Sequence, residues 1–119
     1  MIAAASTFIE AVDEGLTLLV YGRYPVAQQE MNRIAQEESE AADIELEKLA
    51  KTVAAADGSG IFDVQKAWRA FAESEAERQA KDWTGGSGWP LIYFTALKQL
   101  SDDRLKQLRS WFEWFEETR

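Results

Sequence analysis

The sequence contains no cysteine and no histidine among its 119 residues. The missing cysteines exclude disulfides, thiolate nucleophiles and thiolate metal ligands. The missing histidines exclude the usual base at neutral pH and the commonest ligand of transition metals. We therefore expect no cofactor and no metal site, and the sequence predicts a protein that is not an enzyme.

Long apolar runs and positive charge are also scarce. No stretch of about 18 uncharged apolar residues occurs, so the sequence predicts no membrane span. With 13 basic and 21 acidic side chains the net charge is −8. An acidic surface repels phosphate backbones and attracts basic molecules, so we expect no nucleic acid and favour a basic protein as the partner.

The compartment has two interpretations. The first residues lack the positive and apolar regions of a secretory leader, and the chain has no cysteine. Both observations favour the cytoplasm for the chain as given. A leader trimmed from the sequence would instead indicate export.

The sequence does contain apolar residues at helical spacing. Its length suits a single domain, residues 1–119. Thr7 and Glu10 have the form of a capping box, which predicts a helix over about residues 6–22. A second, long helix is expected from Pro25 to Ala56. Its apolar stripe consists of Met31, Ala35, Ala42, Leu46, Leu49 and Val53.

Further helices are expected after the turn that begins at Asp57. Ile61, Val64, Trp68 and Phe71 recur at helical spacing and predict the buried face of a third helix. An apolar segment follows Pro90, and the Ser-Asp-Asp sequence at residues 101–103 is typical of the start of a last helix. No strand-like alternation occurs. The predicted fold is all-α, with about four to five helices built around one long helix.

The glycine-rich segment before Pro90 is the candidate binding site. It is unlike a phosphate-binding loop, because no Lys-Ser or Lys-Thr follows the glycines. Trp89 either packs against the third helix or acts as an exposed anchor for a partner. The candidate partner-binding residues are Gly85, Gly86, Ser87, Gly88 and Trp89.

The last helix ends in an aromatic segment that includes Trp111 and Trp114. These side chains either seal the core or form an interface, and the second interpretation predicts a homodimer through them. Two carboxylate clusters are interpreted as solvated helix surface, because residues two apart point to different faces of a helix. These clusters are Glu37, Glu38 and Glu40, and Glu73, Glu75 and Glu77.

Several short motifs share an order and a spacing. They are Met31-Asn32, Asp43 after an alanine, Gln65 with Trp68, Phe71 and Glu75, the glycines with Pro90, and finally Arg104. Together, over about residues 28–108, they resemble the LprI-type lysozyme-inhibitor family. The positions to which we assign a structural role are Met31, Asn32, Asp43, Gln65, Trp68, Phe71, Glu75, Pro90 and Arg104.

The resemblance implies a small helical domain without enzyme activity that binds and inhibits lysozyme. Where the family usually has cysteine, this chain has Ile34, Ala76 and Ala96. The disulfide that the family would imply between the third helix and the segment after the glycine loop is therefore expected to be replaced by packing. The alternative hypothesis is a cytoplasmic interaction or assembly module.

Overall fold

The structure, a computed structural model, describes residues 24–119. They form three α-helices and one short 3-10 helix, and no strand occurs among these residues. The all-α class is thus confirmed, whereas the expected number of four to five helices was too high for this part of the chain. The helix predicted over residues 6–22 lies outside the described residues. The elements are α2 (Tyr24–Asp57), α3 (Gly60–Ala80), η1 (Lys81–Trp83) and α4 (Trp89–Thr118).

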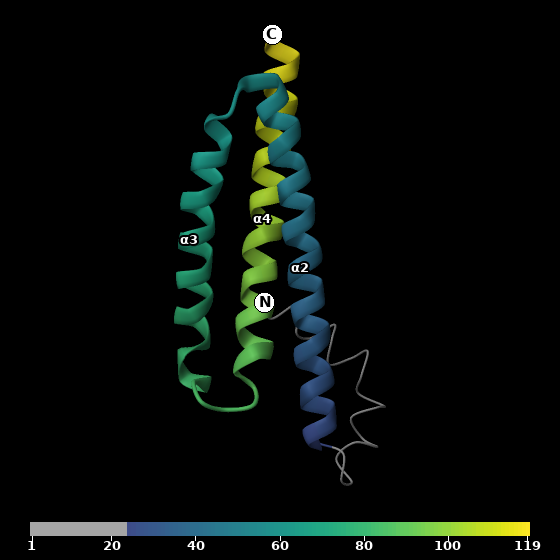
Figure 1. Cartoon of the computed structure of the whole chain (residues 1–119), viewed down its shortest axis with the longest axis vertical. Coiled ribbons are helices and arrows are strands. Elements are labelled where there is room, and N and C mark those ends of the chain that lie inside the picture. Colours follow the sequence, from purple (N-terminus) through teal and green to yellow (C-terminus); the bar gives the residue numbers. More distant parts are fainter. Residues whose placement is uncertain (1–23) are drawn as a thin grey trace.

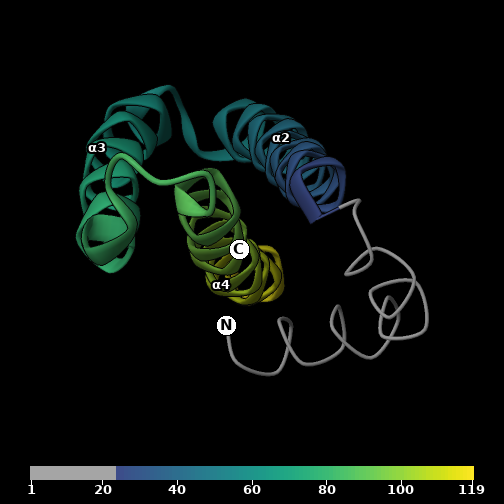
Figure 2. The same ribbon diagram turned by 90° about the horizontal axis from the view of Figure 1, so that it is seen from below.

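The three long helices lie side by side as a bundle (Figure 1). α2 and α4 run in the same direction, and α3, which follows α2 in the chain, runs in the opposite direction. Seen end-on, the helices occupy the corners of a triangle (Figure 2). The 34 residues of α2 span about 50 Å at about 1.5 Å per residue, so α2 is the long helix that the sequence predicts. The C-terminal end of α4 extends beyond it (Figure 1).

α4 is one continuous helix, so the prediction that a new helix starts at Ser101 was wrong. Ser101 is fully buried and continues the buried stripe of Leu97, Leu105 and Leu108. Burial of this stripe keeps the segment helical, although serine and aspartate have only modest helix propensity. Asp102 accepts a hydrogen bond of 2.7 Å from Lys98 one turn earlier, instead of capping a helix start.

The three helices contribute side chains of unequal size to the hydrophobic core. α4 packs mainly against α2, and these two helices bury large side chains such as Leu46, Val53 and Leu97. From α3, by contrast, the buried side chains are three alanines, all with no exposed surface. We call Ala72, Ala76 and Ala80 the alanine stripe.

The alanine stripe joins α3 to α4. Ala72 and Ala76 form one buried cluster with Ala96 and Leu97, and larger side chains, including Trp68 and Tyr93, pack around it. Two of the positions at which the resemblance implies cysteine, Ala76 and Ala96, are therefore both in this cluster.

α3 is rotated relative to the prediction from its sequence. We expected Ile61, Val64, Trp68 and Phe71 to face the core, but Val64 is 52% exposed and Phe71 is 58% exposed. Ile61 and Trp68 are half-buried. Successive helical residues are about 100° apart, so burying the alanines turns the larger side chains toward the edge of the interface. Small side chains let two helices approach closely, and here they decide which face is buried.

Candidate functional site

A tight loop from Thr84 to Gly88 connects the short helix η1 to α4 at one end of the bundle (Figure 1). Gly85 has a φ of 83°, in the left-handed region that favours glycine. The Gly86 amide donates a 2.9 Å hydrogen bond to the Trp83 carbonyl, and the Trp89 amide donates to the Gly86 carbonyl at 3.3 Å. The loop is thus internally hydrogen-bonded, while its residues from Thr84 to Ser87 are exposed.

A side chain of α2 holds the loop in place. Asn32 Nδ2 donates a 2.9 Å hydrogen bond to the carbonyl oxygen of Ser87. Gln28 Nε2 in turn donates to Asn32 Oδ1 at 2.9 Å, and Gln28 is 6% exposed. Because Gln28 is buried, it fixes the orientation of the Asn32 amide, and Asn32 fixes the loop.

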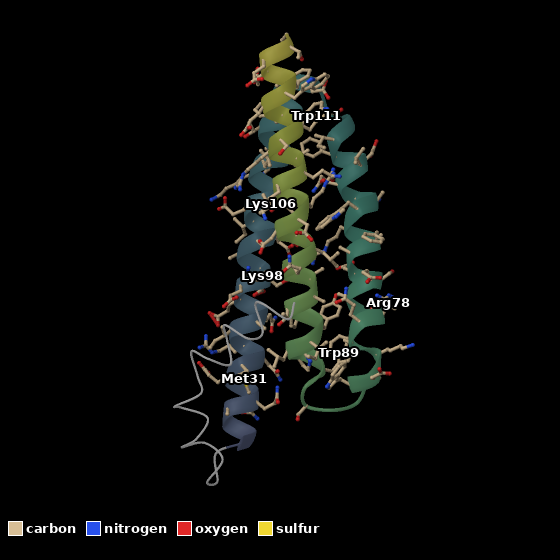
Figure 3. All side chains as sticks on the ribbon, turned by 180° about the vertical axis from the view of Figure 1, so that it is seen from behind. Met31, Arg78, Trp89, Lys98, Lys106 and Trp111 are labelled. Carbon is tan, nitrogen blue, oxygen red and sulfur yellow. The ribbon has the colours of Figure 1, made fainter. Side chains whose placement is uncertain are left out.

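Two tryptophans flank this loop in different ways. Trp89 is the first residue of α4, is half-buried and stacks on Tyr93, with ring centroids 4.6 Å apart. Figure 3 shows Trp89 close to the loop, between α4 and α3. Trp83, just before the loop, is 45% exposed. The more accessible aromatic ring beside the glycines is thus that of Trp83, which was not among the residues predicted for this site.

The loop end of the bundle offers groups for binding another molecule. Ser87 and the Trp83 ring are exposed there. Within residues 24–119 no group of three or more carboxylates is placed to hold a metal ion. No helix in the same range is both long and apolar enough to cross a bilayer. Recognition of another molecule is what this arrangement can provide.

Gln65 and Arg104 lie in the middle of the bundle and contact each other. Arg104 Nε donates a 2.7 Å hydrogen bond to Gln65 Oε1, which links α4 to α3. Burial lowers the pKa of the Arg104 guanidinium from its ordinary value. This pair occupies two of the positions that carry the resemblance, and its contact fastens two helices without touching the loop.

Asp43 lies in a second polar link, between α2 and α3. The Arg69 guanidinium donates to Asp43 across the helices and, through Nε, to Glu73 Oε2 at 3.1 Å. Burial alone would lower the pKa of Arg69, but its hydrogen bonds to these two carboxylates raise it. All three side chains are about a third or more exposed, so the ion pair contributes at most about 1 kcal/mol to stability.

Glu75 accepts three hydrogen bonds within α3. Arg78 donates two, at 2.7 and 2.6 Å, and Gln79 donates one at 2.9 Å. The hydrogen bonds from Arg78, then that from Gln79, lower the pKa of Glu75 to about 2. A depressed carboxyl pKa stabilises the folded chain above the ordinary value of about 4.5, and this contribution is lost as the pH falls toward 2.

Removing the arginine should reverse this shift. In Arg78→Ala we expect the pKa of Glu75 to rise toward the ordinary range of a glutamate, because the largest cause of its lowering is gone. A side-chain carboxyl NMR titration measures this pKa directly. Arg109→Ala is the matched control, an exposed arginine on another helix, and should leave the Glu75 titration unchanged. An unaltered Glu75 titration in Arg78→Ala would contradict the assignment.

Trp111 and Trp114 lie far from the glycine loop. Trp111 is 22 residues after Trp89 in the same helix, about 33 Å along its axis at about 1.5 Å per residue. Figure 3 shows Trp89 and Trp111 toward opposite ends of α4. Trp111 stacks on Phe115 at 5.0 Å between ring centroids, while Trp114 is 58% exposed. The two aromatic regions therefore cannot form one site.

The acidic clusters are spread over helix surfaces. On α2, Glu37 pairs with Arg33, and Glu38 and Glu40 are exposed. On α3, Glu73 forms an ion pair with Arg69, and Glu75 forms one with Arg78. The carboxylates of these clusters do not converge into a metal-binding group among the described residues.

Comparison with known proteins gives one match. The family model described as Lysozyme inhibitor LprI matches residues 24–108 of this chain, well over half of its length. No curated protein and no solved structure matches. The matched range begins with α2 and includes the glycine loop and the first two thirds of α4.

Proposed function

Because the chain belongs to the LprI lysozyme-inhibitor family over residues 24–108, we propose that it is a non-enzymatic protein that binds lysozyme and inhibits it by direct contact. Beyond family membership, the proposal rests on the glycine loop at one end of the bundle. There an exposed, hydrogen-bonded glycine loop stands beside the exposed ring of Trp83.

Rigidity suits this loop to binding. Ordering a flexible loop costs free energy on association, and a loop already held by Asn32 avoids much of that cost. Gly85, Gly86 and Ser87 are small enough to let the backbone approach a concave partner surface. Trp83 adds the kind of side chain that most often dominates a protein interface.

Charge complementarity supports the same partner class. The chain carries a net charge of −8, and a strongly basic lysozyme would be attracted to it over a distance. This attraction raises the encounter rate. The short-range contact that stops catalysis is assigned to the loop residues Gly85, Gly86, Ser87 and Gly88, with Trp83 and Trp89 at their flanks.

The proposal is tested by adding the purified chain to lysozyme that is degrading bacterial cell walls. We expect clearing of the suspension to slow as the chain approaches and exceeds the molar amount of lysozyme. Undiminished clearing at a large molar excess would show that the protein is not a lysozyme inhibitor.

Two tryptophan variants test which end of the bundle is used. Trp83→Ala should weaken inhibition about tenfold or more, because an aromatic anchor typically contributes about 2 kcal/mol or more, and about 1.4 kcal/mol is a factor of ten. Trp114→Ala removes a ring at the far end that is even more exposed, 58% against 45%, and should inhibit normally. The reverse pattern would move the lysozyme contact away from the glycine loop.

A further inference from the structure

α3 carries a second apolar stripe that the described helices cover only in part. Ile61, Val64, Trp68 and Phe71 follow the three-and-four spacing by which paired helices pack. We call these four residues the outer stripe. Val64 and Phe71 are more than half exposed, although each would be expected in a core. A contiguous apolar stripe on a surface usually marks a contact with another molecule.

An open groove lies next to one end of this stripe. It has a volume of about 550 Å³ and is lined by residues of all three helices, among them Ile61 and Val64 from α3 and Gln107 and Trp111 from α4. Phe71 lies outside the groove, seven residues and two helical turns after Val64 on the same face of α3. One face of the molecule thus presents both an exposed phenyl ring and a groove that is mostly apolar.

We propose that two copies of this chain associate through the outer stripe, with their α3 helices antiparallel. A two-fold axis between Ala67 and Trp68 brings Phe71 opposite the partner's Val64, since the two residues are equally far from the axis along the helix. The ring of Phe71 then enters the groove of the other copy. Two-fold symmetry makes each such contact twice.

The charge distribution favours a second copy as the occupant. A chain with a net charge of −8 repels itself over most of its surface. The outer stripe has no charged residue, and at its C-terminal end Glu75 is neutralised by Arg78. The groove is lined by one carboxylate, Asp57, and one guanidinium, Arg104, so their formal charges cancel. Two copies can therefore meet on this face with little repulsion, and a basic partner would gain little electrostatic attraction there.

The size of the surface predicts how tightly the copies bind. Stable complexes usually bury about 800 Å² on each partner. The outer stripe supplies only part of this area, and Trp111, which lines the groove, extends the same face on α4. The dimer should therefore be weak and depend on concentration. Ile61, Val64 and Trp68 lie in the half of α3 remote from the glycine loop, and Phe71 lies just past its midpoint, so dimerisation leaves that loop free.

Sedimentation equilibrium of the whole chain over a range of concentrations tests the dimer. The apparent mass should rise from that of a monomer toward that of a dimer. Phe71→Glu should keep the chain monomeric, because it places a carboxylate in the groove of the partner. Ile44→Glu is the matched control, a 52% exposed apolar residue on α2, and should dimerise as before. Circular dichroism should show that both variants retain their helices.

Disulfide trapping tests the antiparallel geometry, because a chain without cysteine gives an unambiguous background. Ala67→Cys, next to the axis, should form a disulfide-linked dimer under mild oxidation. Ala55→Cys, on an exposed position of α2, should not. The inference is overturned by a monomer at every concentration, or by a dimer that Phe71→Glu leaves intact or that Ala67→Cys does not trap.

The lysozyme assay separates the two proposals. If Phe71→Glu abolishes inhibition, the outer stripe is the contact surface for lysozyme and the second-copy inference is wrong. If the chain dimerises as described but does not inhibit lysozyme, the inference stands and the proposed function fails.

Discussion

Replacing Leu97 by alanine should lower the free energy of unfolding by about 2–5 kcal/mol. Leu97 is 1% exposed and lies in the buried cluster with Ala72, Ala76 and Ala96. Alanine side chains cannot rotate into the space that the leucine leaves, so the cavity stays largely open. Domains of this size are typically stable by only about 5–15 kcal/mol, so the loss is a large fraction of the total.

Denaturant unfolding monitored by circular dichroism measures the effect of Leu97→Ala. Ile44→Ala is the control, since it removes similar atoms from a side chain that is 52% exposed, and its effect should stay within about 0.5 kcal/mol. Equal losses in the two variants would mean that Leu97 does not lie in the core.

The second large effect is expected from Ala76→Leu. Ala76 has no exposed surface and belongs to the alanine stripe that joins α3 to α4. A leucine there must push the helices apart or adopt a strained conformation, which typically costs about 1–3 kcal/mol. Leucine and alanine both favour helices, so the loss would report packing and not helix propensity.

Ala70→Leu provides the matched substitution on the exposed surface of the same helix. Its melting temperature should stay near that of the natural chain, whereas that of Ala76→Leu should fall by roughly 4–8 °C for each kcal/mol lost. If Ala76→Leu melts at the same temperature as Ala70→Leu, α3 is not closely packed at its alanines.

The long helix and the turns were predictable because local sequence decides them. The expected range from Pro25 to Ala56 differs from α2 by one residue at each end. The turn after α2 was predicted from Asp57 and its glycines, and Gly58 has a φ of 104°. Glycine permits this left-handed conformation at little cost, so the signal for the turn is explicit in the sequence.

The buried face of α3 was not predictable in the same way. Two stripes of different size share the helix, and we expected the larger side chains to be buried because they would remove more apolar surface from water. Packing of α3 against α4 instead buries the alanine stripe, two residues of which share a cluster with Ala96 and Leu97. The outcome depends on the distance between two helices, which periodicity within one helix does not contain.

The candidate site was likewise predictable from the sequence only in part. The glycines predicted the loop, but Trp83 was not predicted as a site residue, because the segment before it was interpreted as the end of a helix with few apolar residues. Asn32 was singled out without a partner, since Ser87 is 55 residues away in the sequence. Its hydrogen bond to the loop becomes evident only when α2 and the start of α4 are seen to lie together at one end of the bundle.

The unequal burial of the helices also determines how the native protein opens. α2 and α4 pack through leucine and valine side chains, whereas α3 contributes three buried alanines and the half-buried Trp68, and is linked to the other helices by the polar contacts of Gln65 and Arg69. Its detachment therefore exposes less apolar surface than separation of the other two helices. In hydrogen exchange the amides of α3 should be the first of the three helices to lose protection, as one cooperative unit, while α2 and α4 remain closed until the whole domain unfolds.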